Sequence, residues 1–503
     1  MIARRTALGL LAAATGAALA RPVAAGAAEP LIDEARRRAA APWRGASSAL
    51  PPPFDGLTYD AYRGIRPKPG AAALLPLGEG WAVDLLPPGL YFPDPVTVEL
   101  PEGGGFAPRP FSPRLFDFAP RYFDAVPEEA PGAGFSGLRL RHPLNAAEVL
   151  DEVLVVQGGS YFRAIGRAMA YGLSARAVAR GTGGPAPEEF PRFTRLRLHP
   201  PAVVGTARLE AVIEGPSLAG HMDMTLTPGA STHMALTVTL MPRVEIADIG
   251  VAPLTSMFLK GPIRAAASDD FRPRVHDSDA LVIENGAGEV LWRPISNPAA
   301  LQTSAFADAG PRAFGLWQGP RAFADYEDAE ARYHRRPSAV VRPRGDWGTG
   351  AVTLVEIPTG DEFMDNIVAF WRPEEPLAAG SEHAFAYDLE WTDAAAPLGP
   401  LRRILQSRSG REHHRPGHRR YVIDVAGPSD GLVPDLSALG DGAELSGPSI
   451  HALPEREATR VTFLLAPGGA AAVELRLVLR DAAGRPASPV WLHRWTPARD
   501  GGV

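Results

Sequence analysis

The stretch DWGTGAVTLVEIPTGDEFMDNIVAFW, residues 346–371, indicates the fold class of the whole chain. It contains two runs rich in β-branched and aromatic residues, 352–357 and 367–371, which are typical of strands. A connection of proline, glycine and acidic residues separates the runs. The stretch is therefore predicted to be a β-hairpin, and similar short runs recur along most of the chain.

The connection of this hairpin carries three acidic residues, Asp361, Glu362 and Asp365. One interpretation is a polar hairpin tip in solvent, because acidic residues are common in surface loops. The other is a site that keeps one carboxyl protonated and another ionised, since carboxylates placed close together repel one another. The spacing alone leaves both interpretations open.

Length and composition indicate the class of protein to which the whole chain belongs. A chain of 503 residues exceeds what one hydrophobic core usually organises, so two domains are expected. The 52 glycines and 52 prolines punctuate short alternating runs, which favours an all-β architecture. The formal net charge of −6 argues against nucleic acid as a partner. The chain has no cysteine, so disulfides, thiolate nucleophiles and cysteine-bound metals are excluded.

The first 27 residues have the pattern of an export signal. Arg4 and Arg5 precede a short apolar run that ends near Ala20, as in the twin-arginine type. Cleavage after Ala20 and cleavage after Ala27 both fit, and the alternative is a cytosolic protein with a chance arginine pair. No later segment is apolar enough to span a bilayer, so we expect a periplasmic protein without stable membrane insertion.

The remaining pattern predicts two β domains with a few helices. Residues 28–393 are expected to form a large antiparallel β-sandwich, and residues 407–503 a small immunoglobulin-like sandwich. Residues 394–406, followed by a basic stretch without strand alternation, are interpreted as a linker and an exposed loop. Helices are predicted at 31–41, 145–155 and 323–334.

Aromatic and arginine residues recur beside acidic residues in the large domain. Aromatic faces stack on the C–H faces of sugars, while arginine and carboxylate groups bond their hydroxyls, so such residues are candidates for carbohydrate binding. The alternative for each aromatic residue is ordinary sandwich core. The candidates are Tyr161, Arg163, Tyr171, Trp292, Arg293, Trp317, Tyr326, Tyr333 and Trp347.

A second acidic cluster contains Asp269, Asp270, Asp277 and Asp279. It is typical of a turn stabilised by aspartate, and its spacing also imitates half of a calcium-binding loop. The glycine and the final glutamate of such a loop are missing. The sequence has no metalloprotease, nucleotide-binding or serine-hydrolase motif, so no metal or cofactor is expected. Paired carboxylates are the chemistry that remains.

Five longer runs give a family resemblance. They resemble the periplasmic glucan biosynthesis proteins of the G and D type over residues 50–495. That resemblance implies a galactose-mutarotase-like β-sandwich followed by an immunoglobulin-like domain, and similarity to inverting β-1,2-glucanases and transglycosylases. The runs are GGSYFRAIGRAMAYGLSARAVA (158–179), APLTSMFLKG (252–261), DDFRPRVHDSDAL (269–281), FADYEDAEARYHRRPS (323–338) and GDWGTGAVTLVEIPTGDEFMDNIVAFWRPEEPL (345–377).

The same resemblance implies roles for three acidic residues. Asp365 would be the general acid, Glu362 would assist it, and Asp277 would be the general base acting through water. An inverting pair leaves room for water between its carboxyls, so roughly 6.5 Å or more is expected between Asp277 and Asp365. The alternative is that these acids only bind hydroxyls in a non-catalytic protein of the glucan synthesis machinery.

The resemblance also implies a partner and allows an oligomer. The expected partner is a β-1,2-glucan chain, and a loop near the start of the second domain reaches across a homodimer in the family. Here the stretch 407–420 offers His413, His414 and His418 but no aromatic residue, so its action in trans is left open. Its histidines are interpreted as a solvated basic loop rather than a metal site. The choice between G and D type is also open, although the export signal favours D.

Overall fold

The computed structural model describes residues 29–45, 50–126, 128–263, 269–396 and 398–500. These residues form an almost entirely β protein, which confirms the predicted all-β class. Within these ranges, no helix has the length and apolar character needed to cross a lipid bilayer. The export signal predicted at residues 1–27 lies outside the described residues.

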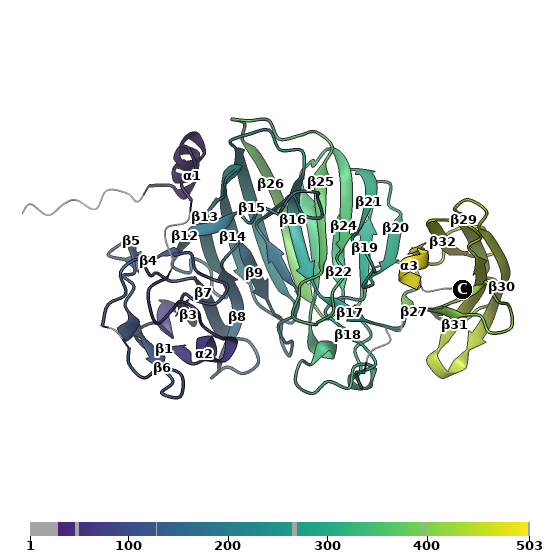
Figure 1. Ribbon diagram of the computed structural model, residues 1–503, viewed down its shortest axis with the longest axis horizontal. Coiled ribbons are helices and arrows are strands. Elements are labelled where there is room, and N and C mark those ends of the chain that lie inside the picture. The colour runs from purple at the N-terminus through teal and green to yellow at the C-terminus, as the bar shows by residue number, and fades with distance from the viewer. Residues whose placement is uncertain (1–28, 46–49, 127, 264–268, 397, 501–503) are drawn as a thin grey trace, which may run out of the picture.

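The larger of two main sheets is 14-stranded within the described residues and runs along the molecule (Figure 1). Its long central strands pair antiparallel in register, as where Met234 faces Leu389. Its order is β29 (Val433–Leu439), β32 (Val473–Arg480), β33 (Val490–Trp495), β20 (Val290–Pro294), β19 (Ala280–Glu284), β22 (Ala313–Trp317), β23 (Ser338–Arg344), β26 (His383–Thr392), β15 (Thr232–Pro242), β14 (Leu218–Thr227), β13 (Ala207–Glu214), β12 (Arg192–Leu198), β4 (Thr97–Glu102) and β5 (Gly105–Pro108).

The second main sheet, 11-stranded in the same residues, contains the predicted hairpin. β24 and β25 pair antiparallel, with Val352 facing Trp371, so this prediction is confirmed. The order is β2 (Leu75–Gly78), β3 (Trp81–Leu86), β7 (Gly137–Pro143), β8 (Leu150–Gln157), β9 (Tyr161–Ala164), β10 (Ser174–Arg176), β16 (Ile249–Ser256), β25 (Ile367–Pro373), β24 (Thr349–Glu356) and β21 (Gln302–Ala309), with β11 (Val178–Arg180) also on β16.

The remaining elements are short or belong to the C-terminal part. A four-stranded sheet has the order β27 (Ile404–Arg411), β28 (Arg419–Ala426), β31 (Ala458–Ala466) and β30 (Glu444–Leu453). Two strand pairs are β1 (Ile65–Pro67) with β6 (Phe116–Phe118), and β17 (Phe258–Lys260) with β18 (Val275–His276). The helices are α1 (Leu31–Ala40), α2 (Tyr59–Arg63) and α3 (Pro497–Asp500), and the 3₁₀ turns are η1 (Pro113–Leu115), η2 (Phe323–Asp325), η3 (Tyr333–Arg335) and η4 (Pro454–Arg456).

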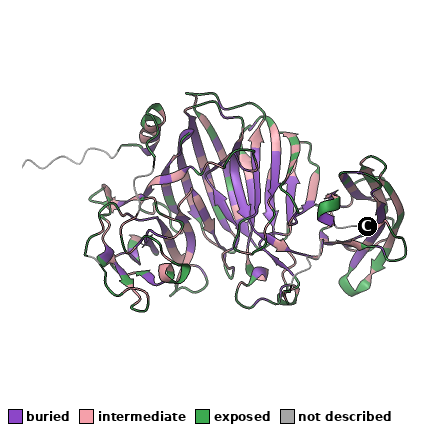
Figure 2. Ribbon diagram, viewed as in Figure 1, coloured by how far each residue is buried: buried purple, intermediate pink, exposed green. Residues whose placement is uncertain are grey.

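The core lies between the two main sheets, whose central strands are mostly buried (Figure 2). One continuous hydrophobic cluster contains Leu254 and Ile367 from the 11-stranded sheet together with Leu236 and Leu389 from the 14-stranded sheet. Burying apolar side chains on both inner faces is the main stabilising term of a β-sandwich. The two packed sheets are therefore a rigid support for the loops at their ends.

The C-terminal strands are continuous with the large sheet. β33 lies parallel to β20, with Leu291 facing Val490 and Trp292 facing Trp491. The predicted linker and exposed loop are wrong in part, because β27 begins at Ile404 and pairs antiparallel with β28, with a register shift between Ile404 and Gln406. That hairpin also contacts the large domain, where the Ser409 hydroxyl donates to the Ile263 carbonyl at 2.6 Å.

One of the three predicted helices is confirmed and two are wrong. α1 spans Leu31–Ala40, with acidic residues first and arginines last. Residues 145–155 instead enter β8, because the valine-rich run there is held between β7 and β9 and Asn145 bonds Asp151 in the preceding turn. Residues 323–334 contain only 3₁₀ turns, since a left-handed backbone at Arg332 (φ 50°) interrupts any helix.

Candidate active site

The loop between β24 and β25 is fixed at its base by a buried asparagine. The Asn366 amide donates to the carbonyls of Phe258 and Ile357 at 3.1 and 2.9 Å, and its oxygen accepts from the Phe258 N–H at 2.8 Å. On the other side of the loop, Asn297 exchanges two hydrogen bonds with the backbone of Thr359. The acidic residues between these two anchors are therefore held in place by the core.

The three acidic residues of this loop have different surroundings. Asp361 stabilises a turn, because its carboxylate accepts from the N–H groups of Phe363 and Met364 at 2.9 and 3.2 Å. Glu362 accepts from the Arg272 guanidinium at 2.7 Å and from the Tyr333 hydroxyl at 2.6 Å. The polar-tip interpretation thus describes Asp361 but not Glu362.

The Asp365 side chain is exposed to solvent, although the protein around it displaces part of its hydration water. This crowding raises the pKa of its carboxyl, because it removes water that would stabilise the charged form. The positive charge of Arg163 opposes the shift, and the negative charge of Asp277 adds to it. Asp365 accepts no hydrogen bond from the described residues, so nothing there favours its ionised form by direct contact.

Asp277 lies just after β18 and is only 4% exposed. Its N–H donates to the Met257 carbonyl at 2.8 Å, and the preceding His276 ring stacks on Phe258 with 5.0 Å between centroids. His276 is buried and bonds Gln318 at 2.9 Å, and burial lowers its pKa to about 3. Asp277 therefore follows a strand, β18, whose His276 side chain is fixed by packing and hydrogen bonding.

Arg336 is the direct partner of Asp277. Its guanidinium donates to the Asp277 carboxylate and lies 4.2 Å from the centre of the Tyr333 ring. Burial raises the pKa of Asp277, whereas Arg336 and Arg163 lower it. The pKa of both carboxyls is raised by burial, but Asp277 has a contacting cation and Asp365 has none among the described residues, and this contact stabilises a negative charge on Asp277.

A long groove of about 810 Å³ lies on the end of the 11-stranded sheet. Its walls combine aromatic rings with charged pairs, such as Arg141 with Asp84 at 2.7 Å and Arg139 with Glu152 at 2.6 Å. Arg163 lines this groove, and its charge also acts on both Asp277 and Asp365. Arg163 therefore links the groove to the two carboxyls electrostatically.

The structure brings only some of the predicted sugar-binding residues to this site. Tyr161, Arg163 and Tyr171 line the groove. The Tyr171 hydroxyl is buried and has no hydrogen-bond partner in the described part of the chain, so it is free for a ligand. Tyr333 reaches the site through its bond to Glu362, although its ring is buried.

Five other candidates lie elsewhere. Tyr326 is core, with its hydroxyl donating to backbone carbonyls at 3.1 Å. Arg293 is buried against Glu356 at 3.3 Å, and Trp347 is buried with its N–H on the Ala386 carbonyl at 3.2 Å. The side chains of all three are used by the core, and none of them lines the groove. Trp292 and Trp317 line a separate cavity that shares no residue with the groove.

Two arginines of the site carry no role in the sequence interpretation. Arg272 joins Asp270, Asp328 and Glu362 at 2.7–2.9 Å, and Arg336 contacts Asp277. Their only signal in the sequence is an arginine among acidic residues, which is also typical of surface ion pairs. Spatial proximity to the carboxyls distinguishes them.

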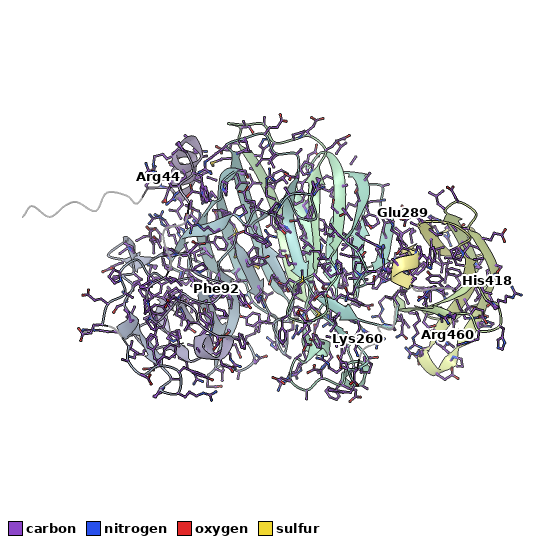
Figure 3. All side chains as sticks on the ribbon, in the orientation of Figure 1. Arg44, Phe92, Lys260, Glu289, His418 and Arg460 are labelled. Atoms are coloured by element: carbon purple, nitrogen blue, oxygen red, sulfur yellow. The ribbon has the colours of Figure 1, made fainter. Side chains whose placement is uncertain are left out.

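The histidine-containing turn between β27 and β28 lies far from the groove of the same chain. Figure 3 labels His418 in the C-terminal part and Phe92, a groove residue, in the other half of the long axis. In the described ranges, no three or more His, Asp or Glu residues are arranged to hold a metal ion.

Comparison with known proteins gives a consistent result. A family model described as "Periplasmic glucan biosynthesis protein, MdoG" matches residues 27–495. Glucans biosynthesis protein G of Vibrio cholerae serotype O1 is 41% identical over 475 residues, covering 93% of this chain and 86% of that protein. The protein of the same name from a Shewanella species is 40% identical with the same coverage. The structural match to a solved polysaccharide lyase covers 71% of this chain and 44% of the lyase chain. The two are 10% identical, and the TM-score is 0.18.

Proposed function

Because the chain belongs to the MdoG family of periplasmic glucan biosynthesis proteins, we propose that it acts in the periplasm on the glucan itself. The proposed substrate is a β-1,2-linked glucan chain lying in the groove, and the proposed reaction is inverting cleavage or transfer of that chain. Aromatic rings beside charged pairs in the groove suit a neutral sugar polymer, which offers C–H faces and hydroxyls.

In the proposed reaction, Asp365 is the general acid. It gives its proton to the glycosidic oxygen as the bond from that oxygen to the anomeric carbon breaks. A water oxygen attacks the anomeric carbon from the opposite face and loses a proton that passes to Asp277. In transfer, a hydroxyl of another glucan replaces this water. Because Asp277 is only 4% exposed, its proton arrives through an intervening water or substrate hydroxyl rather than by direct contact.

The asymmetry of the two carboxyls carries this proposal. General acid catalysis needs one protonated and one ionised carboxyl at the same pH. Arg336 contacts Asp277, while Asp365 is crowded and accepts no hydrogen bond in the described residues. Glu362 is the proposed assistant of Asp365, held in place by Arg272 and Tyr333.

A second candidate function is glucan binding without cleavage, as a scaffold of the synthesis machinery. It is favoured by the family description and by the names of the relatives, which refer to biosynthesis rather than to breakdown. Both candidates use the same groove, so turnover is what separates them.

The test compares three purified full-length proteins on linear β-1,2-glucan: the natural chain, Asp365→Asn and Asp361→Asn. We expect new reducing ends or transfer products from the natural chain and a fall in kcat of about 10²–10⁴ for Asp365→Asn, with glucan binding retained. Asp361→Asn is the matched control, because asparagine also accepts the two N–H groups of the turn. Binding without any product would establish the second candidate, and neither binding nor product would refute the proposed substrate.

A further inference from the structure

A second cavity, of about 510 Å³, lies where the large sheet meets the C-terminal part. One wall is formed by β20, β22 and the residue before β19, and another by the start of β27. Its volume is within the usual range of small-molecule sites. The residues that matter here are Asp279, Trp292, Trp317, Arg321, Asp393 and Arg403.

Two tryptophans give this cavity an aromatic wall. Trp292 is half-buried, and Trp317 is 6% exposed and packs in the same hydrophobic cluster. Neither indole N–H donates a hydrogen bond to any residue that the structure describes. The tryptophan N–H usually finds a hydrogen-bond partner. Each of these two rings can therefore offer a ligand an apolar face and a hydrogen-bond donor.

Arg321 is held by the Arg336 carbonyl and the Ser338 hydroxyl, but three other charged groups of the cavity have no hydrogen-bond partner in the described residues. In the described ranges, no hydrogen bond reaches the carboxylates of Asp279 and Asp393, and the Arg403 guanidinium donates none. His276 Nε2 lies 3.8 Å from the Asp279 carboxylate, which is beyond hydrogen-bond distance, and that ring is held neutral by burial. Asp279 has only 25% of its side chain exposed, and polar groups so placed are normally bonded.

We propose that this cavity is a second saccharide-binding site, which takes a glucosyl unit of a neutral β-linked glucan. Acceptors on Asp279 and Asp393 match sugar hydroxyl donors, the guanidinium and indole groups match sugar oxygens, and Trp292 supplies the stacking surface. Acidic and basic side chains surround the cavity together, which suits a neutral ligand better than an ion. The site rests on the glucan ligand of the proposed function but not on catalysis.

Two sites on one chain have a consequence for binding a polymer. A glucan held in one site raises the effective concentration of its neighbouring units at the other, so a long chain dissociates more slowly than a short one. The cavity would then retain the polymer while the groove acts on another part of it.

The test is isothermal titration of a short linear β-1,2-glucan of defined length into full-length protein with the Asp365→Asn substitution, which prevents turnover. We expect two binding sites per chain. Adding Trp292→Ala should abolish one site or weaken it about tenfold. Adding Asp393→Ala with Arg403→Ala should have a similar effect, and both of these residues are exposed, so this variant keeps the assay valid if Trp292→Ala fails to fold. Trp43→Ala, at an exposed tryptophan outside the cavity, is the matched control.

The outcomes separate this inference from the proposed function. One site per chain that is lost with Tyr161→Ala and unaffected by the cavity variants would refute the second site and leave the groove intact. No binding in any variant would refute the proposed substrate of both sites. Two sites with selective loss in the cavity variants support the inference.

Discussion

Replacing Asp279 with asparagine should stabilise the protein, and the gain should depend on pH. Burial raises the pKa of this carboxyl from 3.8 to about 7, with Asp325 adding to the shift and Arg274 opposing it. The folded state therefore holds the proton more tightly than the unfolded chain does. Below pH 3.8 both states are protonated and the carboxyl costs nothing. As the pH rises to about 7, the unfolded chain ionises first, so the free energy of unfolding falls.

The shift of the pKa sets the size of this effect. At about 1.4 kcal/mol for each pKa unit, the ionised carboxyl destabilises the folded protein by up to about 4 kcal/mol above pH 7. The figure is an upper bound, because 25% of the Asp279 side chain is exposed to solvent. Asparagine has nearly the same shape and no charge, so Asp279→Asn should recover this energy at pH 8 and less than about 1 kcal/mol of it at pH 4.

Urea unfolding at pH 4 and pH 8, followed by tryptophan fluorescence, measures the difference. Asp393→Asn is the matched control, since Asp393 lines the same cavity but is exposed, and its substitution should change the free energy of unfolding little at either pH. An equal effect of Asp279→Asn at both pH values, or a loss of stability at pH 8, would show that burial does not destabilise the charged carboxyl.

The other predictions concern the candidate active site. Arg336→Met should raise the pKa of Asp277 further, which moves the acidic limb of the pH profile of kcat/KM upward by about 1–3 pH units; an unmoved limb would exclude Asp277 as the base. Tyr333→Phe removes a donor to Glu362 and should lower kcat about tenfold with little change in KM, whereas an equal rise in KM would indicate a role in binding. Tyr171→Phe should raise KM about fivefold without lowering stability, because its hydroxyl has no partner in the described protein, and unfolding at a lower urea concentration would contradict this.

The fold class could be predicted because local patterns determine it. Runs rich in β-branched residues such as that of β24 favour a strand, and its pairing follows from the short connection to β25. The parallel contact of β20 with β33 could not be predicted, because Leu291 and Val490 are far apart in the chain and leave no shared local signal. The helix predicted at residues 145–155 does not form, although the sequence there has a helix-capping pattern. Pairing of β8 with β7 and β9 outweighs that local preference.

Of the candidate site, the sequence singles out the acidic residues but not the arginines that contact them. Asp365 and Asp277 lie in long motifs, so the resemblance singles them out, and the structure couples them electrostatically. Their catalytic roles remain a prediction. Arg336 could not be identified, because nothing in the sequence shows which of many arginines meets a given carboxylate. The sequence predicts sugar binding for Trp292 and Trp317 as it does for Tyr161, because composition does not show which sheet and which cavity a residue lines.

The contact of β33 with β20 links the fold to the order in which the chain is made. β20 is synthesised well before β33, so its outer edge is covered only when residues 490–495 have been synthesised. A chain that stops short of them leaves an unpaired edge, which is a template for pairing with other chains. We therefore expect copies that lack β33 to aggregate more readily than the chain that contains it.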